Sequence, residues 1–251
     1  MRVLVCVKRV PAPGARIVLT EDERSIDTSL LSFAVSPHEE CAVEEGVRVA
    51  EANDGTVTVL TLGPPEAEEQ LRSALAVGAQ EAVLIPTDGD DWDPISTAAA
   101  IADAIGQLED SDGGFDLILF GNESADSGGY QVGIRIAHIL GRPIVAGIKG
   151  IDLSDGVVEL RRETATGSEV YRLALPAVAA VKEGINLPRY PTLKGRLNAK
   201  KVDLQRVEEE RLGSGQTMIR LRTPVQEVSE TTILGDPSSV VDLLQELQVL
   251  Q

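Results

Sequence analysis

A polar, glycine-rich stretch at residues 120–133 has the composition of a ligand-binding loop. It follows an apolar run at 117–120 that predicts a buried strand, and a helical pattern with Val132, Ile136 and Ile139 on one face begins directly after it. In open α/β sheets, such loops at the carboxyl ends of parallel strands bind ligands. Free N–H groups and the positive end of the helix dipole favour a phosphate there. The pattern alone leaves two interpretations open, a phosphate site or a capped loop without a ligand.

The side chains of this loop suit hydrogen bonding to phosphate or ribose oxygens. Gly128 and Gly129 permit close approach to the backbone, and Ser124, Ser127 and Gln131 supply hydroxyl and amide groups. The spacing matches neither a Walker A loop nor the Gly-x-Gly-x-x-Gly turn of dinucleotide-binding folds. The loop itself therefore does not define which phosphate compound it would bind.

Two further segments are predicted to border the same crevice. Lys8 and Arg9 follow the first strand, where they could complement a phosphate, face a partner, or remain a solvated basic pair. Ser36 and Pro37 carry the signature of a helix start, and Glu39 completes a capping box.

No arrangement for covalent or acid–base catalysis is evident. His38 and His138 have no Ser or Cys partner at a motif spacing and are too isolated to suggest a metal site. Cys6 and Cys41 lie in apolar contexts that predict buried free thiols. These features favour a binding or carrier role over bond chemistry.

The chain is strongly acidic, with a formal net charge of −17 over 251 residues. This charge argues against nucleic acid and anionic membranes as partners. No apolar run approaches the roughly 20 residues that span a bilayer, and the N-terminus has no signal-peptide pattern, so we expect a cytoplasmic protein. Because the acidic residues are dispersed along the chain, we also form the hypothesis that the surface is adapted to high salt.

Strand and helix patterns alternate over the first 146 residues and predict a doubly wound, mostly parallel, Rossmann-like sheet. Apolar runs predict strands at 2–7, 56–62, 82–85, 117–120 and 143–146. Amphipathic patterns predict the intervening helices, which begin near residues 37, 65, 94 and 132. A small hairpin is predicted at 16–27.

The pattern changes after Gly150. Alternating residues at 157–163 and 169–175 predict an added β-hairpin, and 177–181 predicts another buried strand. Residues 182–201 are expected to form an irregular loop of functional importance.

The end of the chain is predicted to hold a strand at 218–221 and an amphipathic helix at 237–250. We therefore divide the chain into an α/β domain, 1–201, and an extended C-terminal arm, 202–251.

Several segments, in the family's order, resemble the β subunit of electron-transfer flavoprotein. They extend from residue 1 to about 201, and each is weakly specific alone. The matching segments are VLVCVKRV (3–10), SPHEECAVEE (36–45), GP (63–64) with LRSALAVGA (71–79), DLILFG (116–121), Asp126 with QVG (131–133), LPAV (175–178), NLPRYPTL (186–193) and AKK (199–201).

The resemblance implies a heterodimer with an α subunit that holds most of a redox-active FAD. The heterodimer would take electrons from flavin dehydrogenases and pass them to a quinone oxidoreductase or another acceptor. It also implies a fold like that of adenine-nucleotide α-hydrolases, in which the β chain buries a structural AMP. By position, the nucleotide contacts would be Cys6, Ser36, Pro37, His38, Glu39, Leu62, Gly63, Ser124, Ala125, Asp126, Ser127, Gly128, Gly129, Tyr130, Gln131, Val132, Gly133, Ile134 and Arg135.

The loop at about 184–201 resembles the family's recognition loop, in which an exposed leucine anchors in a pocket of the partner dehydrogenase. Leu193 occupies that position here, and basic residues flank it. The resemblance further implies that residues 202–251 pack on the partner subunit. The implied recognition residues are Tyr190, Pro191, Thr192, Leu193, Lys194, Gly195, Arg196 and Lys200.

Alternatives remain for the function. The family usually has Asn at the position of Ser36 and an aromatic residue at that of His38, and its phosphate loop is richer in acidic residues and Thr. These departures leave open a second FAD in place of AMP, as in electron-bifurcating relatives. A stand-alone adenine-nucleotide-binding enzyme or stress-type sensor of the same general fold is the alternative from a different class.

Overall fold

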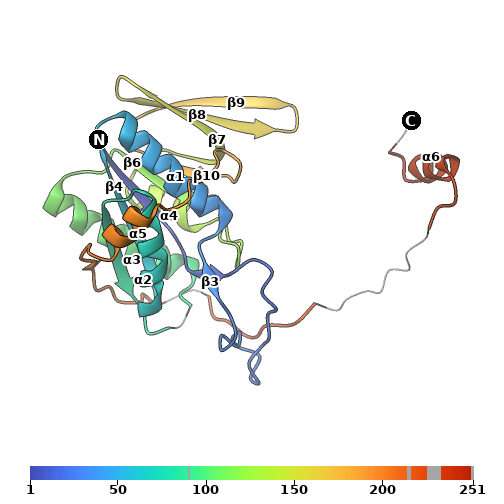
Figure 1. Ribbon diagram of the computed structural model, residues 1–251, viewed down its shortest axis with the longest axis horizontal. Coiled ribbons are helices and arrows are strands. Elements are labelled where there is room, and N and C mark those ends of the chain that lie inside the picture. The colour runs from blue at the N-terminus through green and yellow to red at the C-terminus, as the bar shows by residue number, and fades with distance from the viewer. Residues whose placement is uncertain (90, 214–215, 225–232, 250–251) are drawn as a thin grey trace.

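One mixed sheet with helices on both faces forms the body of the protein (Figure 1). The computed structural model describes residues 1–89, 91–213, 216–224 and 233–249. Within these residues the sheet has nine strands, in the spatial order β11 (Gln205–Arg206), β5 (Glu81–Pro86), β4 (Thr56–Gly63), β1 (Arg2–Cys6), β6 (Leu117–Gly121), β10 (Ala177–Val181), β7 (Ile144–Ser154), β8 (Val157–Thr164) and β9 (Gly167–Ala174).

The pairings confirm the predicted fold class. The strands from β11 to β7 pair in parallel, whereas β8 pairs antiparallel with both β7 and β9. The hairpin β8–β9 projects from the body of the sheet in Figure 1. Strand β7 runs past its predicted end at 146 because it continues, through a register shift between Ile148 and Gly150, into this antiparallel extension.

Both faces of the central sheet are covered by helices, which is why its strands read as continuous apolar runs. Successive residues of β1 point to opposite faces, so that Val3 and Val5 join one core cluster and Leu4 and Cys6 the other. On the first face lie α1 (Pro37–Ala52) and α2 (Glu68–Val77), which follows the short 3₁₀ turn η1 (Pro65–Ala67). The second face is covered by α3 (Pro94–Asp112) and α4 (Val132–Ile139).

The irregular loop predicted for 182–201 is wrong in its second half, because α5 (Leu193–Ala199) forms there. Thr192 caps this helix by accepting a hydrogen bond from the Gly195 N–H, 3.0 Å away. Gly195 is required by packing: a Cβ at this residue would approach the carbonyl oxygen of Ala76 in α2 to 2.3 Å. The glycine therefore lets α5 pack directly on α2.

Two predicted β elements are not formed as expected. The predicted strand at 218–221 does not form. Leu221 donates one backbone hydrogen bond to Glu23, but this segment pairs with no described strand, and Ile219 is exposed. The hairpin at 16–27 is reduced to an isolated bridge between Leu19 and Ile26, because this segment buries no apolar face. Two strands that the patterns do not mark, β2 (Val10–Pro11) and β3 (Phe33–Ala34), pair antiparallel beside it.

The chain after α5 returns to the sheet before it leaves the body. β11 extends the sheet at β5, and Val207 beside it is buried. The C-terminal helix forms as α6 (Pro237–Glu246), capped by Asp236, with no buried residue of its own. Figure 1 shows α6 away from the sheet. None of the described helices combines the length and the apolar character that a membrane crossing requires.

Candidate functional site

The central strands β1 and β6 are neighbours, and their connections lead to opposite sides of the sheet. Such a reversal of strand order opens a crevice at the carboxyl ends of the two strands. Lys8 follows β1 at this edge, and the glycine-rich loop follows β6. The structure thus places the two sequence-predicted segments side by side.

The N-terminus of α1 lies at the same edge of the sheet, against the ends of β1 and β6. Ser36 caps the helix, and its backbone N–H and hydroxyl both donate to the Glu39 carboxylate, at 3.2 and 3.0 Å. The same carboxylate accepts the backbone N–H of Lys8 at 3.0 Å, so the predicted capping box also fastens the end of β1. Burial raises the pKa of Glu39 to about 8, although these hydrogen bonds act in the opposite direction.

Close approach of α1 to β6 depends on Gly121. A Cβ at this position would lie 2.6 Å from Cγ of Glu39 and 3.2 Å from Cβ of His38. Such contacts are shorter than van der Waals distance, so any larger residue would force the helix start away from the strand. The glycine therefore lets α1 begin directly against the end of β6.

An ion pair between Lys8 and Asp126 joins the loops that follow β1 and β6, with Nζ and Oδ2 at 2.5 Å. Although burial alone would raise it, the Lys8 ammonium holds the pKa of Asp126 below its usual value. Asp126 belongs to a tight turn in which the Gly128 N–H donates to the Ser124 carbonyl and the hydroxyls of Ser124 and Ser127 lie 2.9 Å apart. The basic residue after β1 thus orients the loop after β6.

The N-terminus of α4 points its free N–H groups toward this loop. Gln131 occupies the cap position, but its side chain makes no hydrogen bond to the backbone N–H groups of the first turn; its amide oxygen instead accepts from the guanidinium of Arg135 at 3.0 and 3.2 Å. The first N–H groups of α4 therefore lack a capping side chain. Free N–H groups at a helix start, together with the helix dipole, favour an anion.

His38, in the first turn of α1, connects two loops of the same edge. Its Nδ1 accepts the Glu183 backbone N–H at 2.7 Å, and its Nε2 lies 3.3 Å from the carboxylate of Glu123. A hydrogen bond to Glu123 also raises the pKa of Tyr130, whose backbone φ is +53°. The histidine therefore fixes the positions of the loops that follow β6 and β10.

The remaining predicted site residues lie at the same edge. Cys6 is buried at the end of β1, opposite Leu60 and Phe120, and burial raises the pKa of its thiol. Leu62 and Gly63 end β4, the neighbour of β1. Cys6 and Cys41 are both free and buried, as predicted. Among the described residues, no group of three His, Cys, Asp or Glu side chains is placed to hold a metal ion.

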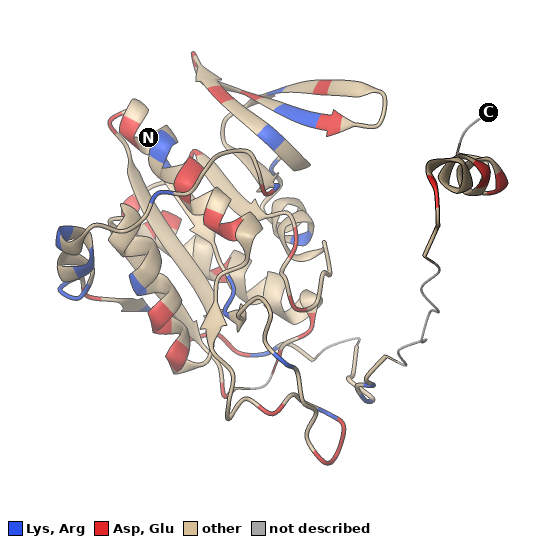
Figure 2. Cartoon of the chain, turned by 45° about the vertical axis from the view of Figure 1, so that its right-hand side comes forward, with Lys and Arg blue, Asp and Glu red and all other residues tan. Residues whose placement is uncertain are grey.

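The segment from residue 186 to residue 201 lies apart from this edge, along α1 and α2. Leu193 is 77% exposed at the start of α5, and Tyr190 is 93% exposed just before it. The charged residues of the short helix α5 are all basic and appear blue in Figure 2, in contrast to the acidic residues on much of the chain. Arg72 of α2 holds the end of this segment by hydrogen bonds to the carbonyls of Ala199 and Val202.

Sequence reasoning missed three polar residues that organise these regions. Glu123 contacts His38, while Asn186 and Arg189 fasten the exposed segment to α1. Each of these contacts joins residues far apart in the sequence, so neither spacing nor periodicity could reveal them. The one local signal was an arginine between Pro188 and Pro191, a basic side chain within a segment of restricted backbone.

The chain is similar to known electron carriers over most of its length. The model of the electron transfer flavoprotein domain matches residues 26–212. The "Electron transfer flavoprotein subunit beta" of Mycobacterium bovis is 36% identical over 208 residues, covering 80% of this chain and 77% of that protein. The protein of the same name from Bacillus subtilis is 33% identical, with 83% and 79% covered. "Protein FixA" of Sinorhizobium fredii is 32% identical, with 81% and 73% covered. The chain therefore belongs to the β-subunit family of electron transfer flavoproteins, a family of electron carriers.

Proposed function

We propose that this chain binds AMP at the crevice between β1 and β6 and, with an α subunit, forms the site of a redox-active FAD. In this role it performs no bond chemistry of its own. The heterodimer accepts electrons from flavin dehydrogenases and passes them to a quinone oxidoreductase or another acceptor in the cytoplasm. The C-terminal arm, residues 202–251, packs on the α subunit.

The observation that carries the nucleotide assignment is the uncapped start of α4 beside the Lys8–Asp126 pair. The N–H groups of this helix start suit a phosphate, and the hydroxyls of Ser124 and Ser127 suit phosphate or ribose oxygens. A Cβ at Gly129 would meet no atom within 4 Å, so the loop leaves space above its backbone. The donor set and the open backbone therefore support binding of the phosphate and ribose of a nucleotide.

The residues of the crevice have separate tasks in this proposal. Lys8 neutralises and orients Asp126, and Glu39 fastens the start of α1 to the end of β1. His38 holds the loops that carry Glu123 and Glu183. When bound, FAD supplies the electron-carrying chemistry, and this chain contributes a rigid wall against it.

The exposed segment supports the second half of the proposal, docking of a dehydrogenase. Leu193 and Tyr190 are large apolar side chains in solvent, next to Lys194, Arg196 and Lys200. Exposed aromatic and aliphatic anchors with a charged rim are typical of protein-binding hot spots. The local basic charge on an acidic chain favours an acidic partner surface.

Extraction of the bound nucleotide tests the proposal directly. The chain is co-expressed with the α subunit of its organism, and the purified complex is denatured to release its ligands for chromatography. We expect a yellow heterodimer with one FAD and one AMP. A complex with two FAD and no AMP would assign the protein to the electron-bifurcating subclass. A colourless homodimer that turns over ATP would refute the electron-carrier role in favour of a stand-alone enzyme or sensor.

A further inference from the structure

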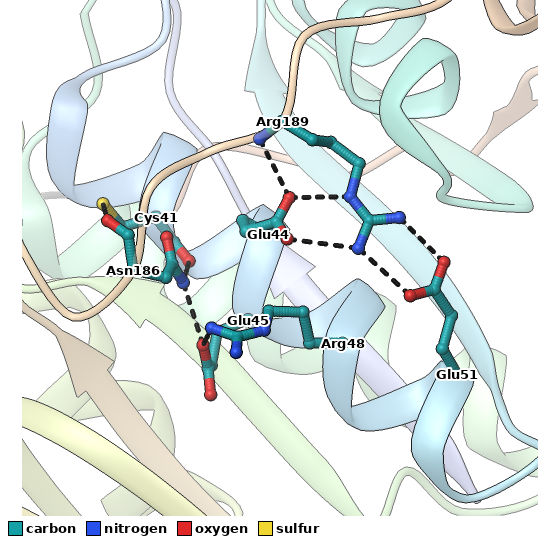
Figure 3. A network of polar contacts seen from close by, with 7 residues as sticks. All are labelled: Cys41, Glu44, Glu45, Arg48, Glu51, Asn186 and Arg189. Carbon is teal, nitrogen blue, oxygen red and sulfur yellow. Dashed lines mark hydrogen bonds and ion pairs between the residues drawn. The ribbon is translucent and has the colours of Figure 1, made fainter.

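Arg189 uses its whole guanidinium group to bind two carboxylates of α1 (Figure 3). Nε and Nη2 donate to the two oxygens of Glu44 at 2.9 and 3.1 Å. Nη1 and Nη2 donate to the two oxygens of Glu51 at 2.8 and 3.1 Å. The backbone N–H of Arg189 also donates to Glu44 at 3.1 Å. Bidentate pairs of this kind fix orientation as well as distance.

Asn186 makes a second attachment one helical turn away on α1. Its amide nitrogen donates to the carbonyl of Cys41 at 3.0 Å and to the carboxylate of Glu45 at 2.9 Å. The side chains of Asn186 and Arg189 therefore face α1 together, as Figure 3 shows. We call this set of contacts, made by Cys41, Glu44, Glu45, Glu51, Asn186 and Arg189, the α1 clamp.

The clamp includes a buried carboxylate of α1, that of Glu44. The side chain of Glu44 is only 8% exposed, and Cys41, Glu44, Arg48 and Glu51 follow each other at three- and four-residue intervals on one side of α1. Burying a carboxylate costs free energy, and a close, well-oriented partner offsets that cost. Arg189 is that partner, and it comes from 145 residues further along the chain.

The side chains between and after the clamp residues point the other way. Leu187 is 91% exposed and Tyr190 is 93% exposed, although each is next to a residue bound to α1. Thr192 then starts α5 and presents Leu193 to solvent. Because the backbone is held at Asn186 and Arg189, these apolar side chains project from a fixed support instead of folding back onto the chain.

We propose that Arg189 is a positioning residue for partner recognition, which holds the segment 186–193 on α1 so that Tyr190 and Leu193 reach an electron-donating partner. This inference rests on the proposed function, because it assigns a role within the same docking step. Fixing the segment before docking lowers the ordering cost of binding. Loss of the clamp weakens docking and leaves electron transfer within the docked complex intact.

The test uses two variants of the complete heterodimer. Removing Arg189 alone would leave Glu44 buried without a partner, so the first variant is the double substitution Arg189→Gln with Glu44→Gln. The second, Glu51→Gln, removes only the exposed half of the clamp. The matched control is Arg142→Gln with Glu109→Gln, a mostly buried pair on the opposite face of the sheet. There, Nη2 of Arg142 contacts both carboxylate oxygens of Glu109 in α3, at 2.7 and 2.8 Å.

Electron transfer is measured with the heterodimer as the variable substrate, a flavin dehydrogenase of the same organism as donor, and a redox dye as final acceptor. We expect the clamp double variant to raise KM about tenfold or more with kcat unchanged, since displacement of an anchor acts on docking. Glu51→Gln should give a smaller rise in KM. The control pair should leave KM unchanged even where it lowers the melting temperature.

Two parallel measurements make the result decisive. Hydrogen exchange at 186–192 should be faster in the double variant, and unchanged exchange would overturn the clamp's holding role. Leu193→Ala separates this inference from the proposed function. If Leu193→Ala raises KM and the clamp variants do not, Arg189 has no positioning role, although the segment still docks. If neither raises KM, the recognition role of the segment is overturned and this inference with it.

Discussion

Lys8 and Asp126 meet across the carboxyl edge of the sheet, with 2.5 Å between Nζ and Oδ2, although 118 positions separate them in the sequence. Each residue alone is unremarkable, one following β1 and the other in a polar turn. Together they connect the two loops that flank the topological switch point. The uncapped start of α4 lies beyond the same turn, so this pair controls how the turn presents its N–H groups.

Replacing Lys8 with Met should weaken nucleotide binding. The substitution leaves Asp126 without its cation and removes positive charge beside the anion-binding position. We expect affinity for AMP to fall about 10- to 100-fold, the range for losing a charge-assisted contact. Equilibrium dialysis of the nucleotide-stripped heterodimer measures this directly.

Two controls accompany the Lys8 substitution. Lys8→Arg retains the charge and should bind AMP nearly as well as the unmodified complex. Lys194→Met removes one positive charge from α5 and should leave AMP affinity unchanged. Equal losses in all three variants would point to a general effect of net charge and contradict the specific role of Lys8.

The buried carboxyl of Glu39 should make stability depend on pH. Its pKa is about 8 in the folded chain, against a reference value of 4.5, so the folded state binds the proton more tightly. The stability that this proton-binding group adds to the folded state is therefore fully present below about pH 4.5 and is lost as the pH rises through about 8. Between these two pH values, this group alone lowers the free energy of unfolding by up to about 1.4 kcal/mol for each unit by which the pH rises.

Urea unfolding of the purified protein between pH 5 and 8.5 measures the slope. Glu39→Gln keeps an acceptor for the capping box and should flatten the profile. Glu21→Gln, in an exposed turn, should leave the profile unchanged. An identical slope in the Glu39 variant would show that this carboxyl is already ionised throughout the range.

Much of the fold could be predicted because its signals are local. The start of α1 follows from Ser36, Pro37 and Glu39, which act within one helical turn. The parallel core follows from apolar runs that only a sheet covered on both faces accommodates. The glycine-rich loop was likewise placed correctly at the carboxyl end of a central strand.

The parts that could not be predicted depend on tertiary contacts. Gly195 argued against a helix by propensity, yet its contact with Ala76 is what allows α5 to pack on α2. β11 has two residues and forms because β5 offers an open edge. The pairing of Arg189 with Glu44 and Glu51 arises only when the segment after β10 crosses α1.

The hypothesis that the protein is adapted to high salt rests on its net charge of −17. At low ionic strength the dispersed carboxylates repel one another over a screening length of about 30 Å, which shrinks to about 3 Å at 1 M salt. We therefore expect the melting temperature to rise with KCl from 0.01 to 1 M and to level off near the top of that range. Scanning calorimetry at several KCl concentrations checks this, and a melting temperature independent of salt would contradict the hypothesis.

The exposed side chain of Leu193 gives the most direct test of partner docking. Leu193→Ala removes an apolar anchor that is 77% exposed and makes no contribution to the core, so folding and assembly should be unaffected. Truncation of a hot-spot anchor typically costs 2 kcal/mol or more, which corresponds to a loss of about 30-fold in transfer efficiency from the dehydrogenase. Stopped-flow reduction of the heterodimer by the substrate-reduced dehydrogenase measures this loss.

The matched control is Leu30→Ala, which truncates a leucine that is 95% exposed in a different part of the chain. Both variants should retain the flavin content and the heterodimer stability of the unmodified complex, and only the Leu193 variant should lose transfer efficiency. Because exposed leucines are common on protein surfaces, exposure alone cannot distinguish the two positions. What distinguishes Leu193 is its support by α2 and the α1 clamp and the basic residues around it, so equal transfer rates in the two variants would remove the anchor from the docking proposal.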